Sequence, residues 1–241
     1  MDIREVEEFV KYRIANTVVR MYPFPHFFVE NVFPDEYYRE ILANWPGSDR
    51  FQSLAATGRT SGDAYKERFV VSLMKVGQEE GDWRGKVFWE SFSRWFVGNS
   101  FLQFLMLRFQ PLILKGRTLP AQISVVPDGL LVQDHTSYAI GPHTDAPHRL
   151  VSTLFYCPPD DSQRHLGTSI YTPKGNDIPR EICGVHYPRD RFYKIDTMPF
   201  IPNSMFGFVV SPNSFHGVDR ITDENVRRNV ILHFAKLQNS S

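Results

Sequence analysis

The segment Gly141-Pro142-His143-Thr144-Asp145 is closely followed by the strand-like run Arg149–Tyr156, and together they decide which fold to expect. Residues i and i+2 of an extended strand face the same side, so His143 and Asp145 can point at one ion. His216 comes 73 residues later (216 minus 143), after another apolar run. Because distant strands lie side by side in a rolled sheet, we expect these three side chains to meet at one metal ion.

The chemistry of these ligands narrows the choice of metal. Two imidazoles and a carboxylate suit Fe(II), Mn(II) or Zn(II) better than metals that prefer thiolates. The two cysteines, Cys157 and Cys183, form no Cys-x-x-Cys pair, which disfavours a zinc finger. A histidine after a Gly-Pro turn is just as often a plain loop residue. The strand-like runs around the motif, and not the spacing alone, therefore favour the metal site.

Length, charge and composition exclude several classes of protein. A chain of 241 residues with 42% hydrophobic residues can bury one sizeable core, so we expect a single domain, 1–241. Lysine and arginine balance aspartate and glutamate at 27 each, which favours neither a nucleic acid nor an anionic membrane as partner. The sequence has no membrane span, no apolar signal core and no disulfide framework, so we expect a cytoplasmic protein.

The first half of the chain reads as helical. Apolar residues recur at helical spacing over about 2–22, with Asp2 as the expected cap, and again over 34–45. A third helical region spans about 83–107 and breaks near Gly98. We therefore expect residues 1–118 to form mainly a helical cover.

After Pro120 the pattern changes to short β-type runs separated by turn residues. The candidate strands are Ala121–Val126, Leu130–Gln133, Leu150–Tyr156, Ser169–Tyr171, Phe192–Ile195, Met205–Val210 and Val226–Phe234. Many short strands after a helical layer predict an α+β fold with a β-sandwich or barrel over about 119–236. The long irregular segment 158–202 is expected to border the site in part, while His165 and His186 within it are expected to be solvated.

These motifs, taken in order, resemble a known family. Four segments resemble Fe(II)- and 2-oxoglutarate-dependent oxygenases, most closely their prolyl-hydroxylase-like branch. They are His143-Thr144-Asp145, Arg149–Tyr156, Phe215-His216-Gly217-Val218 and Arg227-Arg228-Asn229. The resemblance covers about residues 120 to 236. It implies a double-stranded β-helix core, that is, a jelly-roll or cupin-like fold, with Fe(II), 2-oxoglutarate and O2 at His143, Asp145 and His216.

The resemblance also implies an arginine on the last core strand that holds the distal carboxylate of 2-oxoglutarate. Arg227 and Arg228 compete for this role and face opposite sides of an extended strand. Arg228 shares its side with Val230, Leu232 and Phe234, and we expect this greasier face to pack under the helices. The other face is more polar and suits a pocket wall, which favours Arg227.

Further contacts follow from the same resemblance. Tyr156 is expected to meet the 2-oxoglutarate carboxylate, and Gln133 stands where relatives often have a tyrosine on the same cosubstrate. Independently of the resemblance, Arg149 and His135 lie near the metal motif in the sequence and are candidates for substrate contact, although simple solvent exposure is the more common outcome for a histidine such as His135. Asp145 itself favours hydroxylation, since halogenating relatives replace this carboxylate.

The most favoured function is a 2-oxoglutarate-dependent hydroxylase of a small polar metabolite, such as an amino acid, a sugar derivative or a carrier-linked intermediate, with release of succinate and CO2. A peptidyl or protein hydroxylase is the second reading. A cupin-like protein that binds a metal without catalysis is the third. The sequence leaves the oligomeric state open.

Overall fold

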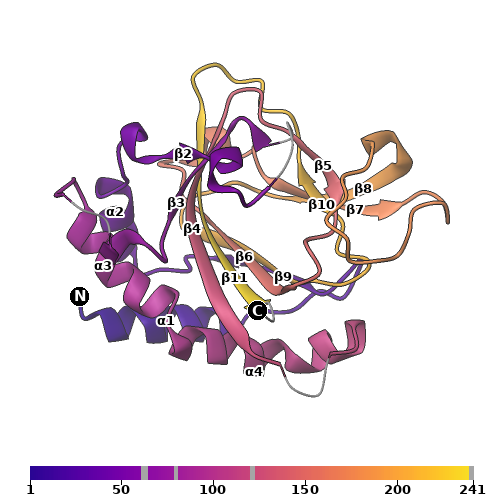
Figure 1. The fold of residues 1–241 in the computed structure, drawn as a ribbon, viewed down its shortest axis with the longest axis horizontal. Helices are drawn as coiled ribbons and strands as arrows, with labels where there is room; N and C mark the ends of the chain where they lie inside the picture. Colours follow the sequence, from indigo (N-terminus) through magenta and orange to yellow (C-terminus); the bar gives the residue numbers. More distant parts are fainter. Residues whose placement is uncertain (61–64, 79–80, 120–122, 239–241) are drawn as a thin grey trace.

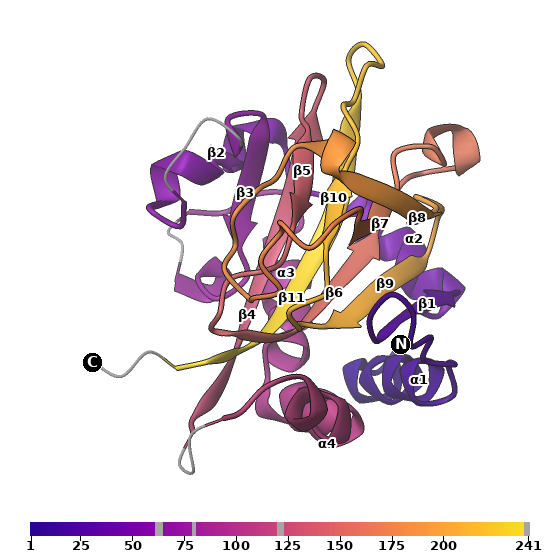
Figure 2. The same ribbon diagram turned by 90° about the vertical axis from the view of Figure 1, so that its right-hand side faces the viewer.

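Two antiparallel sheets face each other, with helices on the outer side of the larger one (Figure 1). The computed structural model describes residues 1–60, 65–78, 81–119 and 123–238. The larger sheet has seven strands in the order β1-β9-β6-β11-β4-β3-β2, and the smaller has four in the order β5-β10-β7-β8. Figure 2 shows the smaller sheet in front of the larger one. This arrangement confirms the expected α+β class with a β-helix core.

The strands of the larger sheet are β1 (His26–Glu30), β2 (Gln52–Ser53), β3 (Arg68–Ser72), β4 (Val125–His135), β6 (Arg149–Tyr156), β9 (Ser204–Val209) and β11 (Arg227–Leu237). Those of the smaller sheet are β5 (Ile140–His143), β7 (Thr168–Pro173), β8 (Phe192–Met198) and β10 (His216–Val218). The α-helices are α1 (Ile3–Ala15), α2 (Asp35–Ala43), α3 (Lys86–Phe96) and α4 (Asn99–Gly116). Among the described residues, no helix is both long and apolar enough to cross a bilayer.

The helices begin near the predicted positions, but α1 ends at Ala15 rather than near Tyr22, and α4 continues past Leu107 to Gly116. The Asp2 side chain accepts a hydrogen bond from the backbone amide of Arg4 and so caps α1, whose buried face carries Val6, Val10 and Ile14. The break expected near Gly98 separates α3 from α4. The aromatic side chains of α3 and α4 pack against the larger sheet, which anchors the cover to the core.

Strand β11 lies at the centre of the larger sheet, between β4 and β6. Its alternate residues belong to two separate apolar clusters. Ile231 and Ala235 pack with the helices, while Val230, Leu232 and Phe234 pack in the space between the sheets. On β11, the side that faces between the sheets is thus as apolar as the side that faces the helices.

Residues 1–118, expected to be mainly a helical cover, supply helices α1 to α4 and also part of the larger sheet. Strands β1, β2 and β3 come from this half and extend both edges of the larger sheet. The predicted strand Ala121–Val126 lies partly outside the described residues, and its described end merges with Leu130–Gln133 into β4. Strand β4 continues through the turn-like Pro127-Asp128-Gly129, because β11 pairs with it along its whole length.

Candidate metal centre

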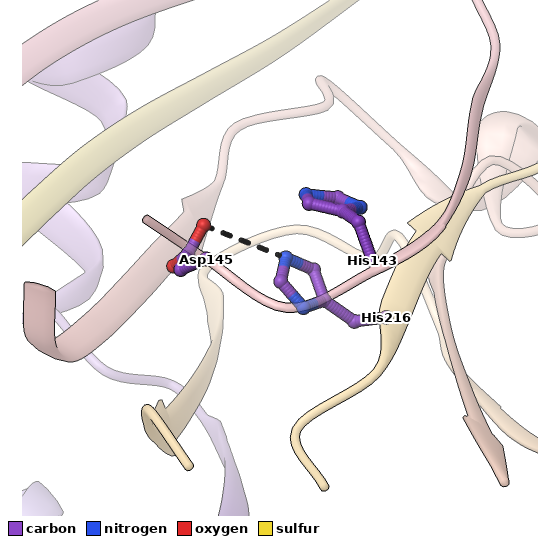
Figure 3. A group of neighbouring side chains, drawn as sticks. All are labelled: His143, Asp145 and His216. Atoms are coloured by element: carbon purple, nitrogen blue, oxygen red, sulfur yellow. Dashed lines mark ion pairs between the residues drawn. The ribbon is translucent and has the colours of Figure 1, made fainter. Parts of the chain in front are cut away.

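His143, Asp145 and His216 converge, as predicted, at one point between the two sheets (Figure 3). His143 ends β5 and His216 begins β10, and the two residues are direct partners across these neighbouring strands. One ligand atom from each of the three side chains lies within 4.8 Å of the other two. His216 Nε2 lies 4.0 Å from Asp145 Oδ1, and all three residues are buried. The cluster therefore has the spacing of a preformed site for one ion.

Backbone carbonyls orient both imidazoles. His143 Nδ1 lies 3.0 Å from the carbonyl oxygen of Gly141, and His216 Nδ1 lies 3.0 Å from that of Ser214. A hydrogen bond from Nδ1–H to a carbonyl fixes the tautomer and leaves Nε2 as the free lone pair. Both rings are thereby prepared to bind a metal through Nε2.

The Asp145 carboxylate is held from two sides. Arg149 Nη1 donates to Oδ1 over 2.8 Å, and the Ser152 hydroxyl donates to Oδ2. The Arg149 guanidinium also lies 3.8 Å from the centre of the Phe234 ring, which fixes its plane. Arg149, expected to bind substrate, thus contacts a metal ligand directly and still lines the cavity described below.

The protonation states also suit a metal. Burial, then His216 and His186, hold the pKa of His143 well below its usual range, and burial likewise lowers the pKa of His216. Burial raises the pKa of Asp145, but Arg149 and the two histidines outweigh it and bring that pKa below its usual range. Near neutral pH the three groups are therefore two neutral imidazoles and a carboxylate, the forms that coordinate metals.

A cavity of about 720 Å³ opens beside the three residues. Its walls include apolar side chains from both sheets, among them Leu54, Leu130, Val132, Ile140, Leu154, Phe208, Val218, Leu232 and Phe234. Charged and polar groups lie at two ends. Arg68 and Thr168 mark what we call the inner end, and Arg59, Asp128 and Lys236 mark the outer end.

The segment between β7 and β8 covers part of this cavity, as expected for the 158–202 region. Cys183, Gly184 and His186 line it. The segment is tied down by hydrogen bonds from Cys183 N to Thr144 Oγ1 and from Tyr187 N to the carbonyl of Pro142. A Cβ atom at Gly141 would lie 2.6 Å from the carbonyl oxygen of Tyr187, so this close approach requires glycine.

His186 and Tyr65 are site residues that the sequence did not reveal. The His186 ring centre lies 4.6 Å from that of His143, and Tyr65 Oη lies 3.0 Å from His186 Nε2. The expectation that His186 is solvated is therefore wrong. Its loop carries no periodic pattern, and only the fold-back onto β5 brings the ring to the metal centre.

The structure contradicts the choice of Arg227 over Arg228. Arg227 is exposed, whereas Arg228 is fully buried on the side of β11 that faces between the sheets. The prediction assumed that the more apolar face must pack under the helices. The prediction fails because the side of β11 that faces between the sheets is as apolar as the side that faces the helices. The side under the helices also accepts a polar residue, since His233 packs between Phe96 and Phe101.

Arg228 belongs to a buried cluster behind the inner end of the cavity. It donates to the Leu166 carbonyl, to Asp134 Oδ2 over 2.9 Å and to the Thr168 hydroxyl over 3.0 Å. Arg68 binds the same Asp134 carboxylate through two hydrogen bonds. Two guanidinium groups therefore share one carboxylate, which leaves one positive charge (two minus one).

Tyr156 lies in this cluster, as expected, while Gln133 and His135 do not reach the cavity. The Tyr156 hydroxyl donates to Thr168 Oγ1 over 2.8 Å. Gln133 and His135 lie on the opposite face of β4 from Asp134, where His135 stacks on Phe69 at 4.5 Å. Their predicted contacts with 2-oxoglutarate and substrate were wrong, because strand alternation directs Val132 and Asp134 inward instead.

Comparisons with known proteins bear on the fold. No protein-family model and no curated protein matches the chain. The solved structure of a Pseudomonas putida prolyl-4-hydroxylase is similar, with a TM-score of 0.50 and 12% identity over 97% of this chain and 99% of that chain. A Trichoplax adhaerens prolyl hydroxylase in complex with a hypoxia inducible factor peptide fragment gives a TM-score of 0.48 and 16% identity over 97% and 90%. The first likeness confirms the predicted fold, and at this identity it concerns the fold alone.

Proposed function

We propose that this protein is an Fe(II)- and 2-oxoglutarate-dependent dioxygenase that hydroxylates a small polar molecule. The observation that carries the proposal is the buried set of His143, Asp145 and His216 on the wall of a cavity with a cationic inner end. Two histidines and one carboxylate leave coordination positions open, the arrangement found in non-haem Fe(II) oxygenases. With Fe(II), 2-oxoglutarate and O2 bound, such a site supplies oxidation of a C–H bond, with release of succinate and CO2.

The donor set fits Fe(II). The Nδ1 hydrogen bonds leave the Nε2 lone pairs of both imidazoles for the metal, and the low pKa of Asp145 keeps its carboxylate ionised. Arg149 and Ser152 would keep the carboxylate in place while its remaining lone pairs bind the metal. Residues that orient a ligand in this way raise metal affinity by restricting the ligand to its binding geometry.

The inner end of the cavity fits the distal carboxylate of 2-oxoglutarate. Arg68 and Thr168 line this end, and Arg228 and Tyr156 hold Thr168 from behind. Arg228 and Arg68 carry one positive charge more than Asp134 neutralises, and the distal carboxylate of 2-oxoglutarate would balance it. Guanidinium groups suit a carboxylate because they stay charged and can donate two parallel hydrogen bonds to it. We therefore assign the role first given to Arg227 to this cluster, with Arg228 and Arg68 as its cations.

The remaining residues would exclude water and position substrate. Apolar side chains such as Leu154, Phe208 and Leu232 line the space beside the metal ligands. The Cys183–His186 stretch covers the metal centre from the other side. A covered, largely apolar site holds a C–H bond near the metal and limits side reactions.

The cover over the cavity favours a small molecule over a peptide. Arg189 strengthens it through hydrogen bonds to the carbonyls of Ile140 and Val218, in addition to those from Cys183 and Tyr187. A peptide would need this segment to move away. The fold shared with a prolyl-4-hydroxylase keeps the peptidyl hydroxylase as the second candidate.

Turnover of 2-oxoglutarate without substrate tests the proposal. In air, wild-type protein with Fe(II) should slowly convert 2-oxoglutarate to succinate, and His216→Ala should not. Lys194→Met is a suitable control, since exposed Lys194 pairs with half-buried Asp219, and neither residue lines the cavity. If the wild type binds Fe(II) but forms no more succinate than His216→Ala, the non-catalytic metal-binding alternative replaces this proposal.

A further inference from the structure

The outer end of the cavity contains a carboxylate shared by two cations. Arg59 binds Asp128 through two hydrogen bonds, Nη1 to Oδ2 at 2.7 Å and Nη2 to Oδ1 at 3.1 Å. Lys236 Nζ donates to the same Oδ2 over 3.0 Å. The Asp128 side chain is 6% exposed, whereas those of Arg59 and Lys236 are 33% and 29% exposed. The Asp128 carboxylate is therefore enclosed, whereas Arg59 and Lys236 remain accessible from the cavity.

The net charge at this end is positive. Counted with the adjacent pair Arg149 and Asp145, the described lining residues of this end comprise three cations and two carboxylates, the others being Arg59, Lys236 and Asp128, which leaves one positive charge (three minus two) before any metal binds. Burial lowers the pKa of the nearby His148 imidazole, and Arg149 and Lys236 lower it further, whereas Asp145 and Asp128 raise it. A bound divalent ion at Asp145 would increase the positive charge further.

The sheet register relates this end to the metal centre. Ser152, which binds Asp145, lies opposite Phe234 of β11, and Phe234 lies opposite Asp128 of β4. Neighbouring strands are separated by about 4.8 Å, so Asp128 lies about 10 Å from Ser152 across two strand spacings. Phe234 lies between them and offers an apolar surface.

We propose that Arg59 and Lys236 bind an oxyanion of the substrate, a carboxylate or phosphate joined by a short apolar segment to the carbon that is oxidised. This inference names the substrate class and rests on the proposed function. Cations attract the anion, Phe234 and Leu130 contact the apolar segment, and the spacing to Ser152 limits the segment to a few bonds. Asp128 holds the two cations in position and partly neutralises them.

Matched fragments test the charge preference without any turnover. The probes are butyrate, butyl phosphate, butanol and butylammonium, each titrated by ligand-observed NMR into the Zn(II)-substituted protein saturated with 2-oxoglutarate. We expect both anions to bind at least about fivefold more tightly than butanol, and butylammonium more weakly still. The two anions distinguish a carboxylate substrate from a phosphorylated one.

Substitutions at the outer end have opposite expected signs. Arg59→Gln and Lys236→Met should each weaken the binding of both anions about three- to tenfold. Asp128→Asn should strengthen their binding about threefold, because it frees Arg59 and Lys236 from the carboxylate. Butanol binding should not change, nor should anion binding to Lys194→Met, which removes a similar ion pair outside the cavity. Thermal unfolding of each variant confirms that it is folded.

Equal binding of butanol and the anions would overturn the inference, as would weaker anion binding in Asp128→Asn. Tighter binding of butylammonium that is lost in Asp128→Asn would show a site for a cation instead. Binding of 2-oxoglutarate is measured first in the same tube, and its absence would count against the proposed function. The same fragment series on the metal-free protein then still tests the outer end by itself.

Discussion

Arg228 Nη1 lies 2.9 Å from Asp134 Oδ2, and neither side chain is exposed to solvent. Asp134 also binds Arg68, so the carboxylate cannot neutralise both guanidinium groups. A buried surplus charge is costly unless a partner compensates it. Under the proposed function, the distal carboxylate of 2-oxoglutarate would be this partner, which would link the buried ion cluster to the cosubstrate.

Removing either cation of this cluster should weaken 2-oxoglutarate binding. We expect Arg228→Gln and Arg68→Gln each to raise the Kd of 2-oxoglutarate about tenfold or more, because a charge-assisted pair to its carboxylate is lost. Arg227→Gln should change it by less than about twofold, since Arg227 is exposed on the opposite face. Anaerobic titration of the Fe(II) protein measures all three, and Arg68→Gln keeps the test valid if Arg228→Gln is unstable. A larger effect at Arg227 than at the other two positions would contradict this assignment.

Arg149 should support metal binding through Asp145. Substituting Arg149→Met removes the 2.8 Å hydrogen bond to Oδ1, and a lost supporting contact of this kind typically lowers metal affinity about 10- to 100-fold. Competition with a metal chelator measures the change. Arg191→Met, which removes an exposed ion pair with Asp177, serves as the control. Unchanged metal affinity in Arg149→Met would show that Ser152 alone orients the carboxylate.

Gly217 should not tolerate a side chain. A Cβ atom there would lie 2.6 Å from the carbonyl oxygen of Ile140, and this oxygen belongs to the neighbouring strand that ends in His143. We expect Gly217→Ala to lower the free energy of unfolding by about 1–3 kcal/mol and to separate His216 from His143, which weakens metal binding. Gly77→Ala meets no atom of the described residues within 4 Å and is the matched control. Denaturant unfolding and metal titration should show both effects in Gly217→Ala and neither in the control.

His233 should make the protein less stable in mild acid. Burial lowers the pKa of His233 to about 3, against about 6.5 when unfolded, so between these values the unfolded chain binds more protons. This contribution to stability is present above pH 6.5 and is lost progressively as the pH falls toward 3. At pH 5, which is about 1.5 pH units below the unfolded pKa, the free energy of unfolding should be lower by about 2 kcal/mol.

The variant His233→Leu isolates this effect from those of the other buried histidines. Its free energy of unfolding should fall less steeply than that of the wild type between pH 7 and pH 5. Equal slopes in urea unfolding series at the two pH values would mean that His233 is not protonated on unfolding in this range.

The sequence was sufficient for the parts of the site that depend on local spacing. His143 and Asp145 share one side of an extended segment, and the family's order of motifs placed His216 with them. Tyr156 also lies near the expected arginine position, although Arg228 rather than Arg227 faces inward. Strand alternation showed that the two arginines face opposite sides, but it could not show which side was the barrel interior.

Other features depend on contacts between distant segments. Strand β3 brings Arg68 beside Asp134, 66 residues away, and no local pattern marks either residue as part of a cluster. His186 reaches the metal centre only because its loop folds back onto β5. The first half of the chain was read as helical because β1, β2 and β3 are at most five residues long, too short to show a clear period.

Anaerobic visible spectroscopy tests the central claim most directly. Adding 2-oxoglutarate to the Fe(II)-loaded wild-type protein should produce the weak charge-transfer band of a chelate in which His143, Asp145 and His216 hold the metal. His143→Ala should bind Fe(II) poorly and show no band, while Lys194→Met should match the wild type. A band of equal intensity in His143→Ala, or no band in a wild type shown to bind one Fe(II), would contradict the account.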